Sequence, residues 1–225
     1  MARIVKEADE RRNEILDAAE TLFTEKGYSK TTIIDILNQV GIAKGTFYYY
    51  FKSKEEVMDA IIERFIEQDV QKARLIAMDK SLSPVRKICR IIAAGQPRTD
   101  GPKDRMIEEF HLPANAQMQK KSIVRSILAL SPILGEIVSQ GVKERLFSTE
   151  HPLEAMQILL VSGQILFDSS MFTWTPCEME QKINGFIEAM EAVLGAEKGT
   201  FEPMKQILAA GSRCILQESK SRRDG

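Results

Sequence analysis

The sequence is poor in the residues that build metal centres and disulfide frameworks. Its 225 residues include only three cysteines and two histidines. Cys89, Cys177 and Cys214 are widely spaced and odd in number, and no CxxC motif or Cys/His cluster occurs. The pattern therefore predicts neither a zinc site nor a disulfide framework. We expect free thiols, no metal and no cofactor.

The sequence also lacks the signatures of common catalytic sites. His111 and His151 lie far from any serine or cysteine in a recognisable nucleophile setting. GxSxG, Walker A, HExxH, and GxGxxG after a strand are all absent. We therefore expect that the protein is not an enzyme.

Long apolar runs and a strong charge of either sign are missing too. No run approaches 18 apolar residues, and the amino terminus, MARIVKEADERR, lacks the apolar segment of a signal peptide. Lysine and arginine total 31 against 32 aspartate and glutamate, a formal net charge of −1 that excludes a general polyanion binder. With 44% hydrophobic and 28% charged residues, the composition is that of a soluble globular protein. We expect a cytoplasmic protein with no membrane partner.

The period-2 alternation of half-buried strands is missing along the whole chain. Apolar residues instead recur at helical spacing between prolines and glycines. The first helix is predicted from about Glu10 to Lys26, after a polar arm up to about Asp9, and Gly27 ends it. We therefore predict an all-α protein with an amino-terminal three-helix unit and a larger helical domain after it.

The most informative stretch runs from Thr32 to Lys54. Thr32 predicts a helix N-cap, with the acidic Asp35 three residues later. The apolar positions that follow share one helical face: Ile33, Ile36, Leu37 and Val40. Gly41 predicts a left-handed stop, and a second short helix follows from about Lys44 to Tyr50. Two short helices joined in this way are typical of the helix-turn-helix that enters the DNA major groove.

The second short helix has an apolar side and a polar aromatic side. Phe47 and Phe51 lie four residues apart and share a face. The remaining side chains point away from that face or flank it: Lys44, Gly45, Thr46, Tyr48, Tyr49 and Tyr50. Between Lys26 and Lys54 there are five lysines against one aspartate, a local net charge of +4. This charge suits phosphate contact, although an ordinary solvated face fits the lysines equally well.

A long helix is predicted directly after this stretch. Ser53 and Glu56 form a capping box that opens it, and no proline or glycine occurs before about Met78. A helix of about 25 residues is ~37 Å long. It can therefore connect a small DNA-reading unit to a second body.

The segment AKGTFYYYFKSKEEV, preceded by a helix of the form ILDAAETLFTEKGY, resembles the amino-terminal unit of TetR-type transcriptional regulators. Beyond this unit the resemblance is one of length, helical content and layout. It implies a DNA-binding domain at residues 1–54 and an effector-binding and dimerisation domain at residues 55–225. It further implies a sequence-specific repressor that binds a palindromic operator as a homodimer and is released by a small molecule.

The resemblance also implies which residues contact double-stranded DNA. They are Thr32, Lys44, Gly45, Thr46, Tyr48, Tyr49, Tyr50 and Lys54. Gly45 allows a close backbone approach, Lys44 and Thr46 reach base edges or phosphates, and Lys54 holds a phosphate at the next helix start. A packed surface cluster is the alternative for the tyrosines. The region has no arginine for a bidentate guanine contact, which leaves the operator sequence open.

Prolines, glycines and cap residues divide the rest of the chain into further helices. They are predicted from Ser83-Pro84 to about Ala94, from about Lys103 to Leu112, from about Asn115 to Leu146, from Pro152 to about Phe172, from Thr175-Pro176 to Gly195, and from Thr200 to about Gln217. Pro132 lies inside one of them and predicts a kink or break at Ser131.

The helix that begins at Pro152 is apolar nearly all round, so it must be covered on both sides. The domain core alone, or the core together with a second subunit, can provide this cover. The resemblance implies a homodimer built from this helix and either the next helix or the last one. A twofold dimer sets two recognition helices one DNA turn apart, ~34–36 Å.

The resemblance implies an effector pocket in the carboxy-terminal helices. Its expected wall residues are Met106, Phe110, His111, Met118, Met171, Phe172 and Trp174. Methionines adapt to varied apolar ligands, but core packing is the alternative for these side chains, and His111 is either a ligand contact or a structural residue.

The helix-turn-helix leaves a second function open, in which its polar face contacts another protein rather than DNA. Salt dependence separates the two functions, because release of counterions makes DNA binding weaken steeply with salt.

Overall fold

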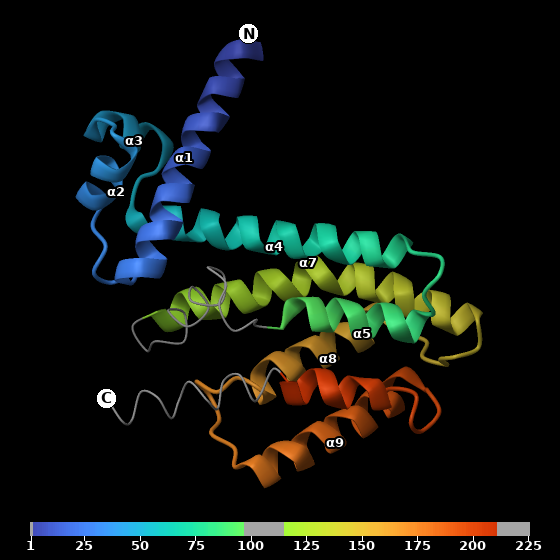
Figure 1. Cartoon of the computed structure of the whole chain (residues 1–225). Coiled ribbons are helices and arrows are strands. Elements are labelled where there is room, and N and C mark those ends of the chain that lie inside the picture. The colour runs from blue at the N-terminus through green and yellow to red at the C-terminus, as the bar shows by residue number, and fades with distance from the viewer. Residues whose placement is uncertain (1, 97–114, 211–225) are drawn as a thin grey trace. The chain divides into compact units, whose positions relative to one another are not determined.

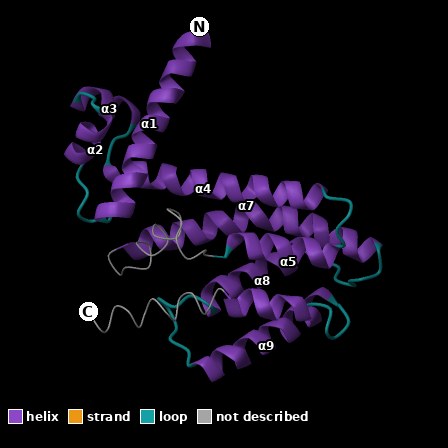
Figure 2. Ribbon diagram, in the orientation of Figure 1, coloured by secondary structure: helices purple, strands orange, loops and turns teal. Residues whose placement is uncertain are grey.

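The computed structural model describes residues 2–96 and 115–210, and within these ranges every regular element is an α-helix (Figure 2). The helices are α1 (Ala2–Lys26), α2 (Ile33–Val40), α3 (Lys44–Tyr50), α4 (Lys54–Met78), α5 (Pro84–Gly95), α7 (Ala116–Lys143), α8 (Pro152–Leu166) and α9 (Pro176–Leu194), and residues 202–210 are also helical (Figure 1). The all-α prediction is confirmed.

The described residues fall into two compact units. The first contains residues 2–65 and 115–119, and the second contains residues 66–96 and 120–210. The chain passes from the first unit to the second within α4, so this 25-residue helix contributes side chains to both cores.

The core of the first unit is formed by α1, the two short helices and the beginning of α4. Its most deeply buried side chains are Ile15, Leu16, Ala19, Phe23, Ile36, Phe47, Phe51, Val57, Met58, Ile61 and Ile62. Arg64 of α4 pairs with Asp17 of α1 at 2.5 Å and also with Glu20. Burial and ion pairing thus fix α4 against α1.

The core of the second unit is built around α7, α8 and α9. Leu134 and Val138 of α7 are fully buried, as is Leu194 at the end of α9. Phe147, which follows α7, stacks on Phe201 with ring centroids 5.9 Å apart. α7 is long and apolar enough to cross a membrane. Core helices of soluble proteins can have the same length and composition, and α7 contributes to this core.

Two buried charges hold helix ends in the second unit. Lys87, 4% exposed, donates to the Ala77 carbonyl in the last turn of α4 at 2.7 Å and to Gln140 Oε1 at 3.0 Å. Glu191, 5% exposed, accepts the N–H groups of Gly199 and Phe201 at 2.9 and 3.0 Å. Lys87 thus donates to the end of α4, and Glu191 accepts from the turn that precedes the helix at residues 202–210.

Several predicted boundaries are confirmed and others are wrong. α1 begins at Ala2 rather than near Glu10, so the expected arm is helical. α9 starts with the predicted Thr175 capping box and stops at Gly195, which has φ 61°. The predicted helix from Lys103 to Leu112 lies outside the described residues.

A kink or a break is predicted at Ser131, and the break is wrong, because α7 continues through Pro132. The proline removes the N–H that would bond to the Leu128 carbonyl. Leu128 is 60% exposed and Pro132 is also exposed. This side of α7 therefore faces solvent, where water can satisfy a backbone carbonyl.

α8 ends at Leu166 rather than near Phe172. The Trp174 Nε1–H donates to the Leu166 carbonyl at 2.9 Å and satisfies one of the final acceptors of the helix. Asp168 then accepts the N–H and hydroxyl of Ser170 at 2.8 and 2.6 Å, which forms a local turn. Side-chain hydrogen bonds thus favour a loop over further helix.

Candidate nucleic-acid interface

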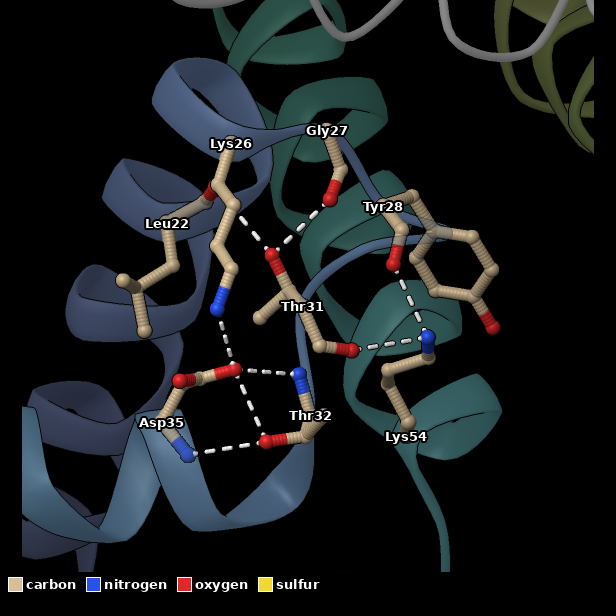
Figure 3. Close-up of polar contacts among 8 residues, drawn as sticks. All are labelled: Leu22, Lys26, Gly27, Tyr28, Thr31, Thr32, Asp35 and Lys54. Atoms are coloured by element: carbon tan, nitrogen blue, oxygen red, sulfur yellow. Dashed lines mark hydrogen bonds and ion pairs between the residues drawn. The ribbon is translucent and has the colours of Figure 1, made fainter.

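The start of α2 is fixed by a network centred on one carboxylate oxygen. Asp35 Oδ2 accepts the N–H and hydroxyl of Thr32 at 2.7 and 2.8 Å, and Lys26 Nζ at 2.7 Å (Figure 3). The Asp35 N–H donates in return to Thr32 Oγ1 at 3.2 Å. This is the reciprocal capping box. Lys26 adds an ion pair that joins α1 to α2, although the carboxylate is exposed enough for solvent to screen the pair.

The same network lowers the pKa of Asp35 to about 2, through the Lys26 hydrogen bond first and then those from Thr32. Since the folded-state pKa lies below the ordinary 3.8, ionised Asp35 stabilises the cap above about pH 4, and this contribution is lost as pH falls towards 2. A carbon-13 NMR titration of the carboxyl group is expected to show its midpoint near 2. A midpoint near 4 would contradict the network.

The turn after α2 and the inner side of α3 match the helix-turn-helix prediction. Gly41 has φ 73°, in the left-handed region, and its N–H donates to the Leu37 carbonyl at 2.9 Å. α3 has only seven residues and no side-chain cap at Ala43. Phe47, 0% exposed, and Phe51, 2% exposed, therefore hold it in place.

The outer side of α3 exposes most of the predicted DNA-contacting residues together. Tyr49 is 79% exposed and Tyr48 is 45% exposed. Lys44 Nζ lies 5.8 Å from the Tyr48 ring centroid, and the Tyr49 and Tyr50 rings meet edge to face at 4.9 Å. Gly45 is exposed as well, and Thr46 and Tyr50 are partly exposed. Aromatic hydroxyls, a cation and a small hydroxyl thus share one surface.

Nothing within the described residues requires a glycine at position 45. It has an ordinary helical conformation, and a Cβ built on it would meet no atom within 4 Å. Glycine is also among the least favourable residues for a helix. The open space is therefore suited to the close approach of a partner outside the chain.

The Thr32 hydroxyl and two of the three Lys54 donors are already used inside the protein. The Thr32 hydroxyl has one proton and donates it in a hydrogen bond to Asp35. It can donate to a phosphate only if this hydrogen bond breaks. Lys54 Nζ donates to the carbonyls of Tyr28 at 2.8 Å and Thr31 at 2.9 Å (Figure 3). The partners of Lys54 lie 26 and 23 positions away in the sequence, so local spacing gave no signal for them.

The structure also adds contacts that sequence reasoning missed. Arg12 of α1 lies over the Phe51 ring at 5.2 Å, next to the end of α3. Glu56 accepts from the Lys52 N–H at 2.6 Å, while its own N–H donates to Ser53 Oγ at 3.2 Å. The capping residues of α4 are therefore as predicted, but the reciprocal bond goes to Lys52.

The expected effector-contacting residues are only partly brought together. Phe172 and Trp174 stack in the loop between α8 and α9 with ring centroids 5.1 Å apart, and Lys182 lies 4.8 Å over the Trp174 ring. Met171 and Phe172 are exposed at 45% and 40%. Met118 belongs to the first compact unit, whereas the loop belongs to the second. The other expected wall residues, Met106, Phe110 and His111, lie outside the described residues.

Comparison with known families matches both parts of the chain. Residues 15–61 match the family described as bacterial regulatory proteins, tetR family. Residues 102–189 match a tetracyclin repressor-like, C-terminal domain. The chain belongs to the TetR family.

Individual relatives and solved structures are similar to this TetR-family chain. The transcriptional repressor KstR2 of Mycobacterium tuberculosis is 33% identical over 88 residues, which are 39% of this chain and 44% of KstR2. The match thus spans less than half of that relative. Among solved structures, RolR in complex with resorcinol is 17% identical, with a TM-score of 0.61 over 91% of this chain and 96% of RolR. SmeT of Stenotrophomonas maltophilia, a repressor of a multidrug efflux pump, is 22% identical, with a TM-score of 0.57 over 84% and 92% of the two chains.

Proposed function

We propose that the chain is a sequence-specific DNA-binding transcriptional regulator, a cytoplasmic repressor that binds a palindromic operator as a homodimer and is released by a small molecule. Residues 1–54 bind DNA in this proposal, and residues 55–225 bind the effector and form the dimer. The observation that carries the proposal is the outer face of α3. It displays a lysine, a threonine and tyrosines around an open glycine, on a helix held from beneath by Phe47.

The proposed DNA contacts follow from the chemistry of this face. Lys44 and the tyrosine hydroxyls bind phosphate, Thr46 reaches a base edge, and Gly45 lets the backbone approach the groove. Since α3 has only seven residues and lacks arginine, one copy offers few contacts. A homodimer doubles them and reads two half-sites.

Exposed apolar residues on α8 support the homodimer. Ile158 is 57% exposed and Val161 is 46% exposed, although Met156, Leu159 and Leu160 of the same helix are buried. α8 therefore has apolar side chains on its outer side as well as in the core. A second copy of the chain would cover them, and an isologous contact gives the twofold symmetry that a palindromic site requires.

The proposal is tested by binding of the full chain to DNA from its own upstream region across a salt series. A specific complex is expected whose affinity falls steeply with salt, since phosphate contact releases counterions. A complex whose affinity does not change with salt would contradict binding through phosphate contacts. The absence of any specific complex, on this DNA or on a selected random library, would contradict the proposal.

Thr46→Ala is expected to change the preference among DNA sequences. One lost base contact costs about 1–3 kcal/mol of discrimination, roughly 5- to 150-fold, while affinity for unrelated DNA is nearly unchanged. The measurement is the ratio of operator to non-specific affinity at one salt concentration. Thr173→Ala, an exposed threonine in the α8–α9 loop, is the matched control and leaves this ratio unchanged. Equal losses on both kinds of DNA would show that Thr46 does not read a base.

A further inference from the structure

The geometry points to Lys54 as a positioning residue for operator binding that acts through the carbonyls of Tyr28 and Thr31 rather than as a direct phosphate contact. This inference rests on the proposed DNA-binding function. We call the ammonium of Lys54 and these two carbonyls the Lys54 bridge (Figure 3). It joins the first residue of α4 to the segment between α1 and α2.

The ammonium of Lys54 has partners within the protein. A lysine has three N–H donors. Two of them are used at 2.8 and 2.9 Å by Tyr28 and Thr31, and the nitrogen also lies 4.3 Å from the Tyr28 ring centroid. The ring face and the two carbonyls thus surround the charge with negative partial charge. With two donors used in this way, one donor is left for a phosphate unless a carbonyl bond breaks.

The ring that faces the ammonium remains a neutral phenol. Burial first, and then the nearby Glu55 carboxylate, raise the pKa of the Tyr28 hydroxyl well above its ordinary value. Glu55 and Glu56 lie in the first turn of α4, directly after Lys54, and both are exposed. The Glu55 carboxylate interacts electrostatically with the Lys54 ammonium and repels an approaching phosphate. The electrostatic surroundings therefore favour the internal bridge.

The bridge adds a long-range contact to a segment whose other hydrogen bonds are mostly local. Thr31 is 1% exposed, and its hydroxyl lies within hydrogen-bond distance of the Gly27 and Leu22 carbonyls at 2.8 and 3.2 Å. Its N–H is also satisfied locally by the carbonyls of Gly27 and Tyr28. The Thr31 carbonyl, however, is held by Lys54 from 23 positions away. Without Lys54 this acceptor would lose its charged donor.

The bridge reaches the DNA-reading helix through the start of α2. Thr32, the residue after Thr31, is the N-cap of α2 and is held on its other side by Asp35 and Lys26. α2 leads through Gly41 to α3. Lys54 therefore fixes where the helix-turn-helix begins, and its loss lowers the fraction of chains ready to bind the operator.

The test compares Lys54→Met with Lys44→Met in the full chain, with a sequence selected from randomised DNA as the probe. Methionine keeps an apolar stem and removes the ammonium. Lys54→Met is expected to lower operator affinity about tenfold through lost hydrogen bonds, while the slope of log affinity against log salt stays at the wild-type value. Lys44→Met, on the exposed face of α3, is expected to reduce that slope by about 0.9, the value for one phosphate.

Amide hydrogen exchange without DNA gives a second readout. Lys54→Met is expected to speed exchange of the Thr31 and Asp35 amides, and Lys44→Met to leave both unchanged. Lys54→Gln restores one neutral donor and is expected to recover part of the affinity at the wild-type slope, even if the methionine variant folds poorly. A slope reduced by about 0.9 in Lys54→Met and Lys54→Gln, with unchanged exchange, would overturn the inference.

The outcome also separates this inference from the proposed function. If the wild-type chain binds no DNA specifically, the proposed function fails. The exchange rates of Lys54→Met then still decide whether Lys54 holds the segment between α1 and α2. If the wild type binds and only the Lys54 slope changes, the function stands and Lys54 is a phosphate contact.

Discussion

Phe47→Ala is expected to abolish operator binding by unfolding the helix-turn-helix. Phe47 is 0% exposed and is the only fully buried side chain of the seven-residue α3. Removing a buried phenylalanine ring costs about 3–5 kcal/mol, because the lost transfer free energy adds to the cost of the cavity. A helix this short has little stability of its own to offset that loss. Amide exchange of α3 and DNA-binding titrations measure the two effects on the same sample.

Two variants control this prediction. Phe47→Leu keeps most of the apolar volume, so its cost is expected near 1–2 kcal/mol and binding is retained in weakened form. Phe172→Ala removes a ring that is 40% exposed in the α8–α9 loop and is expected to leave α3 protected. Protection of α3 in Phe47→Ala equal to the wild type would show that the ring does not hold the helix.

Gly45→Leu is expected to lower operator affinity by more than tenfold without destabilising the protein. A Cβ at this position meets no atom within 4 Å, and leucine favours the helix over glycine by about 0.5–1 kcal/mol. The isolated chain is therefore expected to unfold at the same or a slightly higher temperature. The added side chain instead occupies the space that the DNA groove needs, and a lost close approach removes several contacts at once.

Gly95→Leu is the matched control for this variant. Gly95 lies at the end of α5, is exposed, and has no atom within 4 Å of a built Cβ. We expect it to leave operator affinity unchanged. If Gly45→Leu kept full operator affinity, DNA would not bind at the outer side of α3.

Local signals in the sequence predicted the ends of α2 and α9. The caps at Thr32 and Thr175 and the glycine stops at Gly41 and Gly195 each depend on residues within a few positions of one another. The Phe47 face of α3 follows from helical periodicity in the same way. These features were read from the sequence because the physics that fixes them is short-ranged.

Contacts between distant residues could not be predicted in this way. Arg64 meets Asp17 and Glu20 at separations of 47 and 44 positions, and the Lys54 bridge spans 26 and 23. Pro132 predicted a kink or break, but α7 continues through it on a side where Leu128 and Pro132 face solvent. Packing and solvent access decide such cases, and neither is encoded in local spacing.

Selection of bound sequences from fully randomised DNA by the purified full-length chain tests the central claim most directly. The account predicts enrichment of an inverted repeat whose half-site centres are separated by about 10–10.5 base pairs or a multiple of that distance. Gly45→Leu, carried through the same selection, is expected to enrich no such repeat. A wild-type pool with no enriched sequence after repeated rounds, or identical enrichment by wild type and Gly45→Leu, would contradict the account.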